Sequence, residues 1–168
     1  YQEHFIEALW KENPEWATNV GYHKYDSVLI VPDSAAAAAR LAFAQQQLDS
    51  LKGYDVSKLS DASQIDYQLI ENYLKSVQWG INELKSNEWD PSSFNVSNTF
   101  AFILNENYAP LETRLRSFSS RLEKVPAYYE AAKKQVKDPV AELTSLAIDQ
   151  NNGGVSVFEK DFVDSLQK

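Results

Sequence analysis

The chain has 168 residues, of which 43% are hydrophobic and 24% are charged, and its formal net charge at pH 7 is −8. This length fits one domain or a large piece of a bigger protein, and the hydrophobic fraction excludes a disordered chain. The negative charge argues against binding to nucleic acid or anionic membranes, because both depend on Lys and Arg that neutralise phosphates. The chain has no Cys, which excludes disulfides, and its apolar runs are far shorter than the roughly 20 residues of a membrane span.

The first half of the chain carries two signals for the start of a helix. Asn13 and Pro14 offer an N-cap and a proline at the first helical position, so a short helix is expected from there to Gly21. Asp33 precedes an alanine-rich run, which predicts a long helix that ends at the next glycine. Residues 28–31 are β-branched or large and apolar. For them we expect a loop that packs on the core, with a short strand as the alternative.

The longest helix is predicted to follow Ser60 and Asp61. Its apolar residues recur at steps of three and four, which is the period of an amphipathic helix. These residues are Ile70, Leu74, Val77, Ile81 and Leu84. Gly80 lies inside the pattern, where a glycine costs about 1 kcal/mol relative to alanine. We therefore expect another helix to pack closely at that point.

Prolines divide the second half of the chain into further helices. Pro110, Pro126 and Pro139 each start a helix, and the third is expected to end at the Asn-Asn-Gly-Gly sequence of residues 151–154. A capping box that begins at Ser156 starts the last one. In total we expect about eight helices with short connections, hence an all-α fold in which residues 1–168 form a single helical domain.

No complete catalytic constellation is visible, and we assign no residue to catalysis, cofactor binding or metal binding. His4 lies beside acids, but a zinc site needs three protein ligands, so we interpret it as part of a solvent-facing polar edge. His23 has Asp26 three residues further on. This pair could form an oriented base, and the alternatives are a His that fixes its own loop or one that lines a site.

Two further groups of residues have a structural and a functional interpretation. Trp89 and Asp90 precede a proline and are expected to anchor and cap a turn, with ligand contact through Trp89 as the alternative. Arg114 is expected to pair with an acid on a neighbouring helix, with a substrate carboxylate as the alternative. A basic strip could also exist, for which a solvated helix face is the favoured interpretation. Its residues would be Arg114, Arg116, Arg121 and Lys124.

Four sequence blocks, followed by Val125-Pro126, occur in an order that covers nearly the whole chain. They are Gly21-Tyr22-His23-Lys24-Tyr25-Asp26, Asp66-Tyr67-Gln68-Leu69-Ile70, Glu88-Trp89-Asp90-Pro91 and Tyr108-Ala109-Pro110-Leu111-Glu112-Thr113-Arg114-Leu115. Together they resemble the bacterial family called domain of unknown function 885. Each block is weak alone, and the specificity of the resemblance comes from their order and spacing.

The resemblance implies a larger, mostly helical protein that is similar to zinc-dependent peptidases. Family members carry a His-Glu metal motif well beyond the matched region, and this chain contains no His-Glu dipeptide. No metal ligand is therefore carried over, and zinc is expected in the full-length parent protein only. We expect an N-terminal fragment that acts as a non-catalytic scaffold, walling the substrate cleft and supporting a C-terminal catalytic part. The alternatives are a stand-alone helical module that binds a peptide or protein and, less favoured, a complete small enzyme that depends on His23.

The residues and the resemblance together lead to a set of expected cleft-lining residues, partners and a location. The expected cleft-lining residues are His23, Tyr25, Trp89, Tyr108 and Arg114. The expected partners are the C-terminal catalytic region of the same parent protein and a peptide substrate, without nucleic acid or a membrane span. An exposed apolar surface could also support a dimer. The implied location is periplasmic or membrane-anchored and extracytoplasmic, with the cytoplasm as the alternative.

Overall fold

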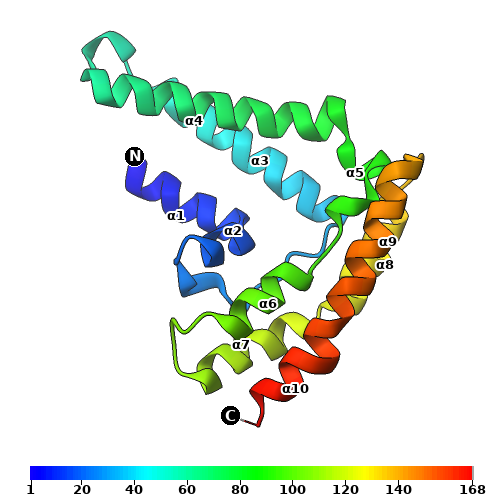
Figure 1. The fold of residues 1–168 in the computed structure, drawn as a ribbon. Helices are drawn as coiled ribbons and strands as arrows, with labels where there is room; N and C mark the ends of the chain where they lie inside the picture. Colours follow the sequence, from blue (N-terminus) through cyan, green and yellow to red (C-terminus); the bar gives the residue numbers. More distant parts are fainter. Residues whose placement is uncertain (168) are drawn as a thin grey trace. The chain divides into compact units, whose positions relative to one another are not determined.

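The computed structural model describes residues 1–167, which form helices joined by turns and loops, without a strand among them. The expected all-α fold is therefore confirmed. The helices fall into two compact units, drawn in Figure 1. The first unit combines Tyr1–Pro32 with the residues from Asn87 onward, and the second unit is Asp33–Ser86.

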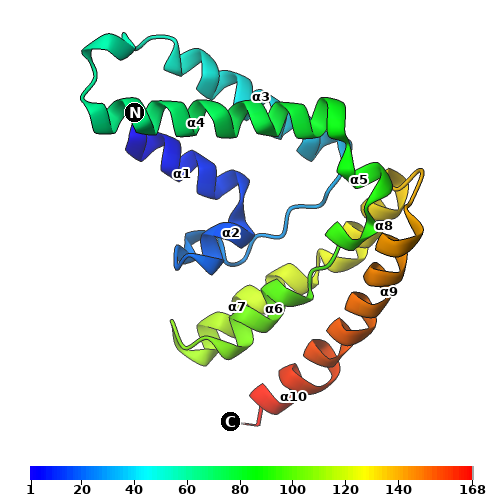
Figure 2. The same cartoon turned by 45° about the horizontal axis from the view of Figure 1, so that its top comes forward.

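The second unit is a helical hairpin made of α3 (Ser34–Leu51) and α4 (Asp61–Trp79), which lie side by side (Figure 2). Both helices begin at the predicted caps. The Asp33 carboxylate accepts a hydrogen bond from the Ala36 amide at 2.8 Å, and the Ser60 hydroxyl accepts one from the Ser63 amide at 3.3 Å. Local side-chain capping thus sets where this hairpin's helices start.

The expectation of close packing at Gly80 is wrong. No atom outside its own helical surroundings lies within 4 Å of the position that a Gly80 Cβ would occupy. Gly80 instead begins a π-helical turn, Gly80–Leu84, which ends at Lys85 in the left-handed conformation. Gly80 therefore lies where α4 changes from α-helical to π-helical pitch. Single π turns of this kind occur mostly within or at the end of α-helices.

The first unit begins with α1 (Gln2–Glu12), α2 (Pro14–Asn19) and a 3₁₀ turn, His23–Tyr25. Gly21 has a φ of +88°, a left-handed conformation that a residue with a Cβ adopts only with strain. It lets the chain reverse between α2 and the 3₁₀ turn. Residues 28–31 form a loop in which Leu29 is buried, so the alternative of a short strand is not realised.

The rest of the first unit is a series of helices connected by short loops. In chain order these are α5 (Ser86–Trp89), a 3₁₀ turn (Pro91–Ser93), α6 (Ser97–Asn105), α7 (Leu111–Leu122), α8 (Val125–Gln135), α9 (Ala141–Ser156), a π-helical turn (Val157–Asp161) and α10 (Phe162–Ser165). Helix α6 lies alongside α7 in both views. The predicted starts near Pro110 and Pro126 are confirmed at Leu111 and Val125.

Aromatic side chains form the centre of the first unit. Phe100 on α6 and Phe118 on α7 are buried, and their ring centroids lie 4.7 Å apart in an edge-to-face arrangement. Phe162 stacks on Phe118 with its centroid at 4.7 Å, and Phe158 contacts Phe100 with its centroid at 5.0 Å. These four rings join α6, α7 and the C-terminal helices into one core, because aromatic pairs add specific contact to a large buried area.

Helix α9 does not end at the Asn-Asn-Gly-Gly sequence, contrary to expectation. It continues to Ser156 and passes directly into the π-helical turn, so no capping box starts a separate helix at Ser156. Gly154 explains the continuation. A Cβ at this position would lie 2.7 Å from the Ser97 Cβ and 2.8 Å from its Oγ. The glycine is therefore used for the close approach of α9 to the start of α6, and not as a helix terminator.

Candidate functional site

The side chains of residues 22–26 point to two sides of the 3₁₀ turn that carries them. Tyr22, Lys24 and Tyr25 contact Glu7 on α1. His23 and Asp26 contact each other and a buried polar cluster on α2 and α7. One short sequence block thus contributes both an anchor on the protein surface and a candidate site.

The Glu7 carboxylate accepts the hydrogen bonds that form the anchor. The Tyr25 hydroxyl donates to Glu7 Oε1 at 2.6 Å, and the Tyr22 hydroxyl and the Lys24 ammonium donate to the same carboxylate. The hydrogen bond from Lys24, followed by those from the two tyrosines, lowers the pKa of Glu7 to about 2. The carboxylate therefore stays ionised and ties the 3₁₀ turn to α1. Tyr25, one of the expected cleft-lining residues, has its hydroxyl committed to this contact.

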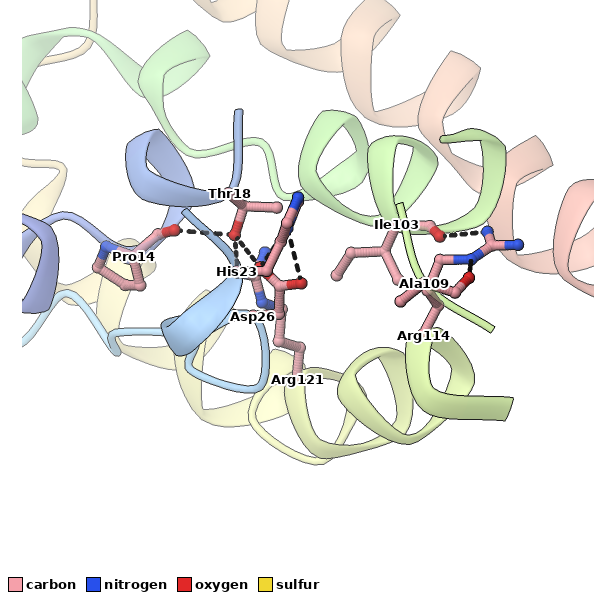
Figure 3. Close-up of polar contacts among 8 residues, drawn as sticks. All are labelled: Pro14, Thr18, His23, Asp26, Ile103, Ala109, Arg114 and Arg121. Carbon is pink, nitrogen blue, oxygen red and sulfur yellow. Dashed lines mark hydrogen bonds and ion pairs between the residues drawn. The ribbon is translucent and has the colours of Figure 1, made fainter. Parts of the chain in front are cut away.

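On the other side of the turn, His23 and Asp26 form a pair, shown in Figure 3. His23 Nδ1 lies 3.1 Å from Asp26 Oδ2 and 3.3 Å from Oδ1. Asp26 is only 4% exposed, and its Oδ1 lies 2.8 Å from the hydroxyl of Thr18, which is fully buried on α2. A buried carboxylate is costly unless it is hydrogen-bonded, and the imidazole stabilises Asp26. The single proton of the Thr18 hydroxyl is shared between Asp26 Oδ1 and the Pro14 backbone oxygen, which lies at 2.9 Å.

Tyr108 holds the imidazole of His23 from one face. The two rings are stacked with centroids 3.6 Å apart and an interplanar angle of 3°, and Phe102 lies beside Tyr108 with its centroid at 6.2 Å. The Tyr108 hydroxyl is buried without a hydrogen-bond partner among residues 1–167. Burial raises its pKa, and the nearby charge of Asp26, which lacks hydrogen-bond geometry to the hydroxyl, raises it further. Tyr108 therefore remains protonated and neutral.

Arg121 supplies the positive charge of the cluster. Its side chain is fully buried on α7, and its Nη2 donates to the Thr18 hydroxyl oxygen at 2.9 Å. Burial lowers the pKa of Arg121, whereas the charges of Glu15 and Asp26 oppose that effect. Burial also raises the pKa of Glu15, and the charge of Arg121 acts against this rise. The guanidinium thus offsets two acids that α2 and the 3₁₀ turn place in the interior.

The geometry of the pair fixes what His23 can do chemically. With Asp26 facing Nδ1, the neutral imidazole carries its proton on Nδ1 and keeps a lone pair on Nε2. Nε2 makes no hydrogen bond among the residues that the structure describes, and 29% of the side chain is exposed. His23 is therefore an oriented imidazole with one free nitrogen. Within residues 1–167, no three His, Cys, Asp or Glu side chains are grouped so that they could hold a metal ion.

Arg114 lies apart from this cluster and has a different role from the expected one. It is buried, and its guanidinium donates to the backbone oxygens of Ile103 at 2.9 Å, Leu104 at 2.8 Å and Ala109 at 2.9 Å. A fourth hydrogen bond reaches Asn107 Oδ1 at 3.3 Å. Two of these oxygens belong to the end of α6, where helical carbonyls lack partners and carry partial negative charge. In the described chain Arg114 caps α6 and forms no ion pair.

The favoured interpretation of a solvated helix face holds for Arg116 and Lys124, which are exposed, and is wrong for Arg114 and Arg121. Arg114 and Arg121 are buried, and Arg116 instead pairs with Glu112 on the same helix at 2.6 Å. The reason is visible in the spacing, since Arg114, Phe118 and Arg121 recur at steps of four and three and share the buried face of α7. This spacing was the available signal for a buried Arg121, whereas Thr18 and Glu7 belong to no motif.

Trp89 belongs to a turn that is hydrogen-bonded to the loop between α8 and α9. Asp90 Oδ1 accepts from the Ser92 amide at 3.0 Å, which is the predicted cap. The backbone oxygen of Trp89 accepts from the Val140 amide at 3.0 Å, and the Glu88 carboxylate accepts from Lys137 Nζ at 2.7 Å. Of the five expected cleft-lining residues, His23 and Tyr108 stack on each other, whereas Tyr25 contacts Glu7 and Arg114 caps α6.

Fold and site together define an all-α protein that presents an Asp–His pair on a buried polar support. The chain belongs to the family of bacterial proteins of unknown function called DUF885, whose model matches residues 14–168. This confirms the resemblance of the four sequence blocks. None of the helices described is both long and apolar enough to cross a membrane.

A solved structure from Shewanella oneidensis, described as "a putative lipoprotein of unknown function", is similar to this chain. The two share 44% sequence identity with a TM-score of 0.95 over 99% of the present chain. The match covers 30% of the Shewanella chain, so the present chain spans less than a third of that protein. The comparison with curated proteins gave no match.

Proposed function

We propose that residues 1–168 are the N-terminal helical scaffold of a longer, peptidase-like protein. In this proposal the scaffold forms a wall of the substrate cleft and supports a catalytic part that is encoded further along the chain. The supporting observation is the match of 99% of this chain to 30% of the Shewanella lipoprotein at a TM-score of 0.95. A region that keeps its fold inside a chain more than three times as long is suited to a supporting role. The resemblance of the sequence blocks supports the peptidase part of the proposal.

The residues described here do not fit a zinc site, since they offer no group of three suitable ligands. In the proposal, zinc is held by the catalytic part, and this chain supplies packing surfaces and the His23 imidazole. Because the related Shewanella protein is described as a lipoprotein, we place the longer protein on the extracytoplasmic side.

The outward face of α9 and α10 favours a scaffold over a stand-alone binding module. The side of these helices that faces the core carries Ala147, Gly154 and Val157. A row of apolar residues along the same stretch of chain, including the residues that flank α9 and α10, is 41–59% exposed. We call this row the α9–α10 stripe, and it consists of Val140, Ile148, Val155, Val163 and Leu166.

Large exposed apolar residues that gather along one stretch of chain often mark an interaction surface, so the α9–α10 stripe is a candidate for a covered surface. We propose that the remaining part of the longer protein covers it. The length of the related chain beyond the matched 30% supports this choice of occupant.

The proposal is tested by comparing residues 1–168 with the longer protein for metal content and peptide hydrolysis. We expect stoichiometric zinc and chelator-sensitive hydrolysis of a mixed peptide library for the longer protein, and neither for residues 1–168. Stoichiometric zinc or peptide hydrolysis by residues 1–168 would contradict the scaffold role. A longer protein without peptidase activity would contradict the peptidase part.

A further inference from the structure

We propose that His23 Nε2 is a proton-accepting contact for an N–H or O–H group of a ligand, with Asp26 as the residue that orients it. This inference deepens the proposed function, in which the ligand would be a peptide. It stands on the geometry of the pair and its support, and no zinc enters it.

The imidazole of His23 is oriented by Asp26. Both oxygens of Asp26 lie within 3.3 Å of Nδ1, so the Nδ1–H tautomer is the one that this environment favours. Nε2 is then an acceptor, and no described residue uses it. A carboxylate behind an imidazole also fixes the tautomer and the orientation of the ring, as it does for metal-binding histidines.

The His23 side chain is also held in place by its neighbours. Tyr108 stacks face to face on His23 at 3.6 Å, which restricts rotation of the imidazole about its own bond to Cβ. Asp26 is held in turn by the buried Thr18 hydroxyl, and Thr18 is held by Arg121 Nη2 at 2.9 Å. A contact point that is fixed before binding loses less conformational entropy when the ligand arrives.

Asp26 faces His23 and not the guanidinium of Arg121. The charge of Asp26 acts on Arg121, whose pKa it raises, but the guanidinium hydrogen-bonds Thr18 and not the carboxylate. Two donors of Arg121, Nε and Nη1, are left without a partner among the described residues. A carboxylate that served stability alone would gain most from these donors. The observed arrangement instead directs it to the partly exposed imidazole.

The test uses diethyl pyrocarbonate, which reacts with the unprotonated nitrogen of an imidazole. Nε2 attacks one carbonyl carbon, an N–C bond forms, ethyl carbonate leaves, and the Nδ1 proton is released. The chain has only two His residues, and His4 is exposed on α1 without a role in the cluster. His4 is therefore an internal reference for the rate, which mass spectrometry reads for each residue separately.

We expect His23 to react faster than His4 although it is less exposed, and the Asp26→Asn variant to slow His23 about tenfold, in line with the loss of an orienting carboxylate. The Asp33→Asn variant, which changes the cap of α3, is the control that should leave both rates unchanged. A His23 rate below that of His4, or an unchanged rate in the Asp26→Asn variant, would overturn the inference.

A second measurement does not depend on a variant that folds. Nitrogen-15 NMR of the unmodified chain distinguishes the two neutral tautomers, because protonated and unprotonated ring nitrogens have different chemical shifts. We expect an unprotonated Nε2 for His23, and a proton on Nε2 would overturn the inference. Neither readout involves zinc or peptide hydrolysis, so its failure is distinguishable from failure of the scaffold proposal.

Discussion

At the scale of single residues, Glu7 decides the conformation of a sequence block that lies outside its own helix. Its carboxylate collects Tyr22, Lys24 and Tyr25, and these contacts leave His23 and Asp26 to face the interior. The block alone gave no reason to pair its tyrosines with α1. The orientation of the Asp–His pair therefore depends on a residue that no motif contains.

We predict that Glu7 makes the free energy of unfolding depend on pH. The pKa of Glu7 is lowered from 4.5 to about 2 in the folded chain, so its contribution to the free energy of unfolding is full above pH about 4.5. That contribution is lost as the pH falls through about 2. In thermal unfolding, the difference in Tm between the native chain and the Glu7→Gln variant should shrink over this window.

Glu15 acts in the opposite direction, because its raised pKa favours the folded chain at low pH. It is present in both the native chain and the Glu7→Gln variant, so its effect cancels in the Tm difference. A Tm difference that is constant from pH 6 to pH 2 would contradict the role assigned to Glu7.

At the scale of helices, the two adjacent glycines of α9 have different surroundings. Gly154 lies against Ser97 at the start of α6, whereas nothing lies within 4 Å of a Cβ placed on Gly153. Both occupy the interior of one helix, where glycine is intrinsically unfavourable. They form a matched pair in which only the tertiary contact differs.

We predict opposite effects for alanine at these two positions. The Gly154→Ala variant should lower the free energy of unfolding by about 1–3 kcal/mol, because the new methyl group overlaps Ser97. The Gly153→Ala variant should raise it by about 0.5–1 kcal/mol through helix propensity alone. Urea unfolding followed by circular dichroism measures both values. A stabilising Gly154→Ala substitution would show that α6 and α9 do not approach closely.

At the scale of the whole molecule, we predict that the rest of the longer protein covers the α9–α10 stripe. The chain has no Cys, so single cysteines can be introduced and their maleimide labelling rates compared. We expect the Ile148→Cys and Val155→Cys variants to label readily in residues 1–168 and to be protected in the longer protein. Asp149→Cys, on an exposed position of the same helix, is the control that should label in both.

Two outcomes would contradict this prediction. Equal labelling of the stripe and of Asp149→Cys in the longer protein would mean that the stripe is not covered. Protection that already occurs in residues 1–168 and increases with protein concentration would identify a second copy of the chain as the occupant, and not the rest of the longer protein.

Much of the fold was predictable because helix starts depend on neighbouring residues. Asp33, Ser60 and the prolines near α2, α7 and α8 placed helices where the structure has them. The errors occurred at glycines. Gly80 was expected to contact another helix, and Gly154 was expected to end one. A glycine permits close packing, a pitch change or a terminus equally well, and only its spatial neighbours decide among them.

The candidate site was predictable only in part. The sequence alone determined the helical class and the family. It also determined that His23 lies near Asp26, because two residues three positions apart in one turn cannot lie far from each other. The tertiary structure decided which ring stacks on His23, that Arg114 caps α6, and that Arg121 reaches Thr18 across 103 residues of sequence. Contacts of this kind depend on how helices pack. A pattern of residue types along the chain can predict which face of a helix is buried, but it does not predict which residue of another helix packs against that face.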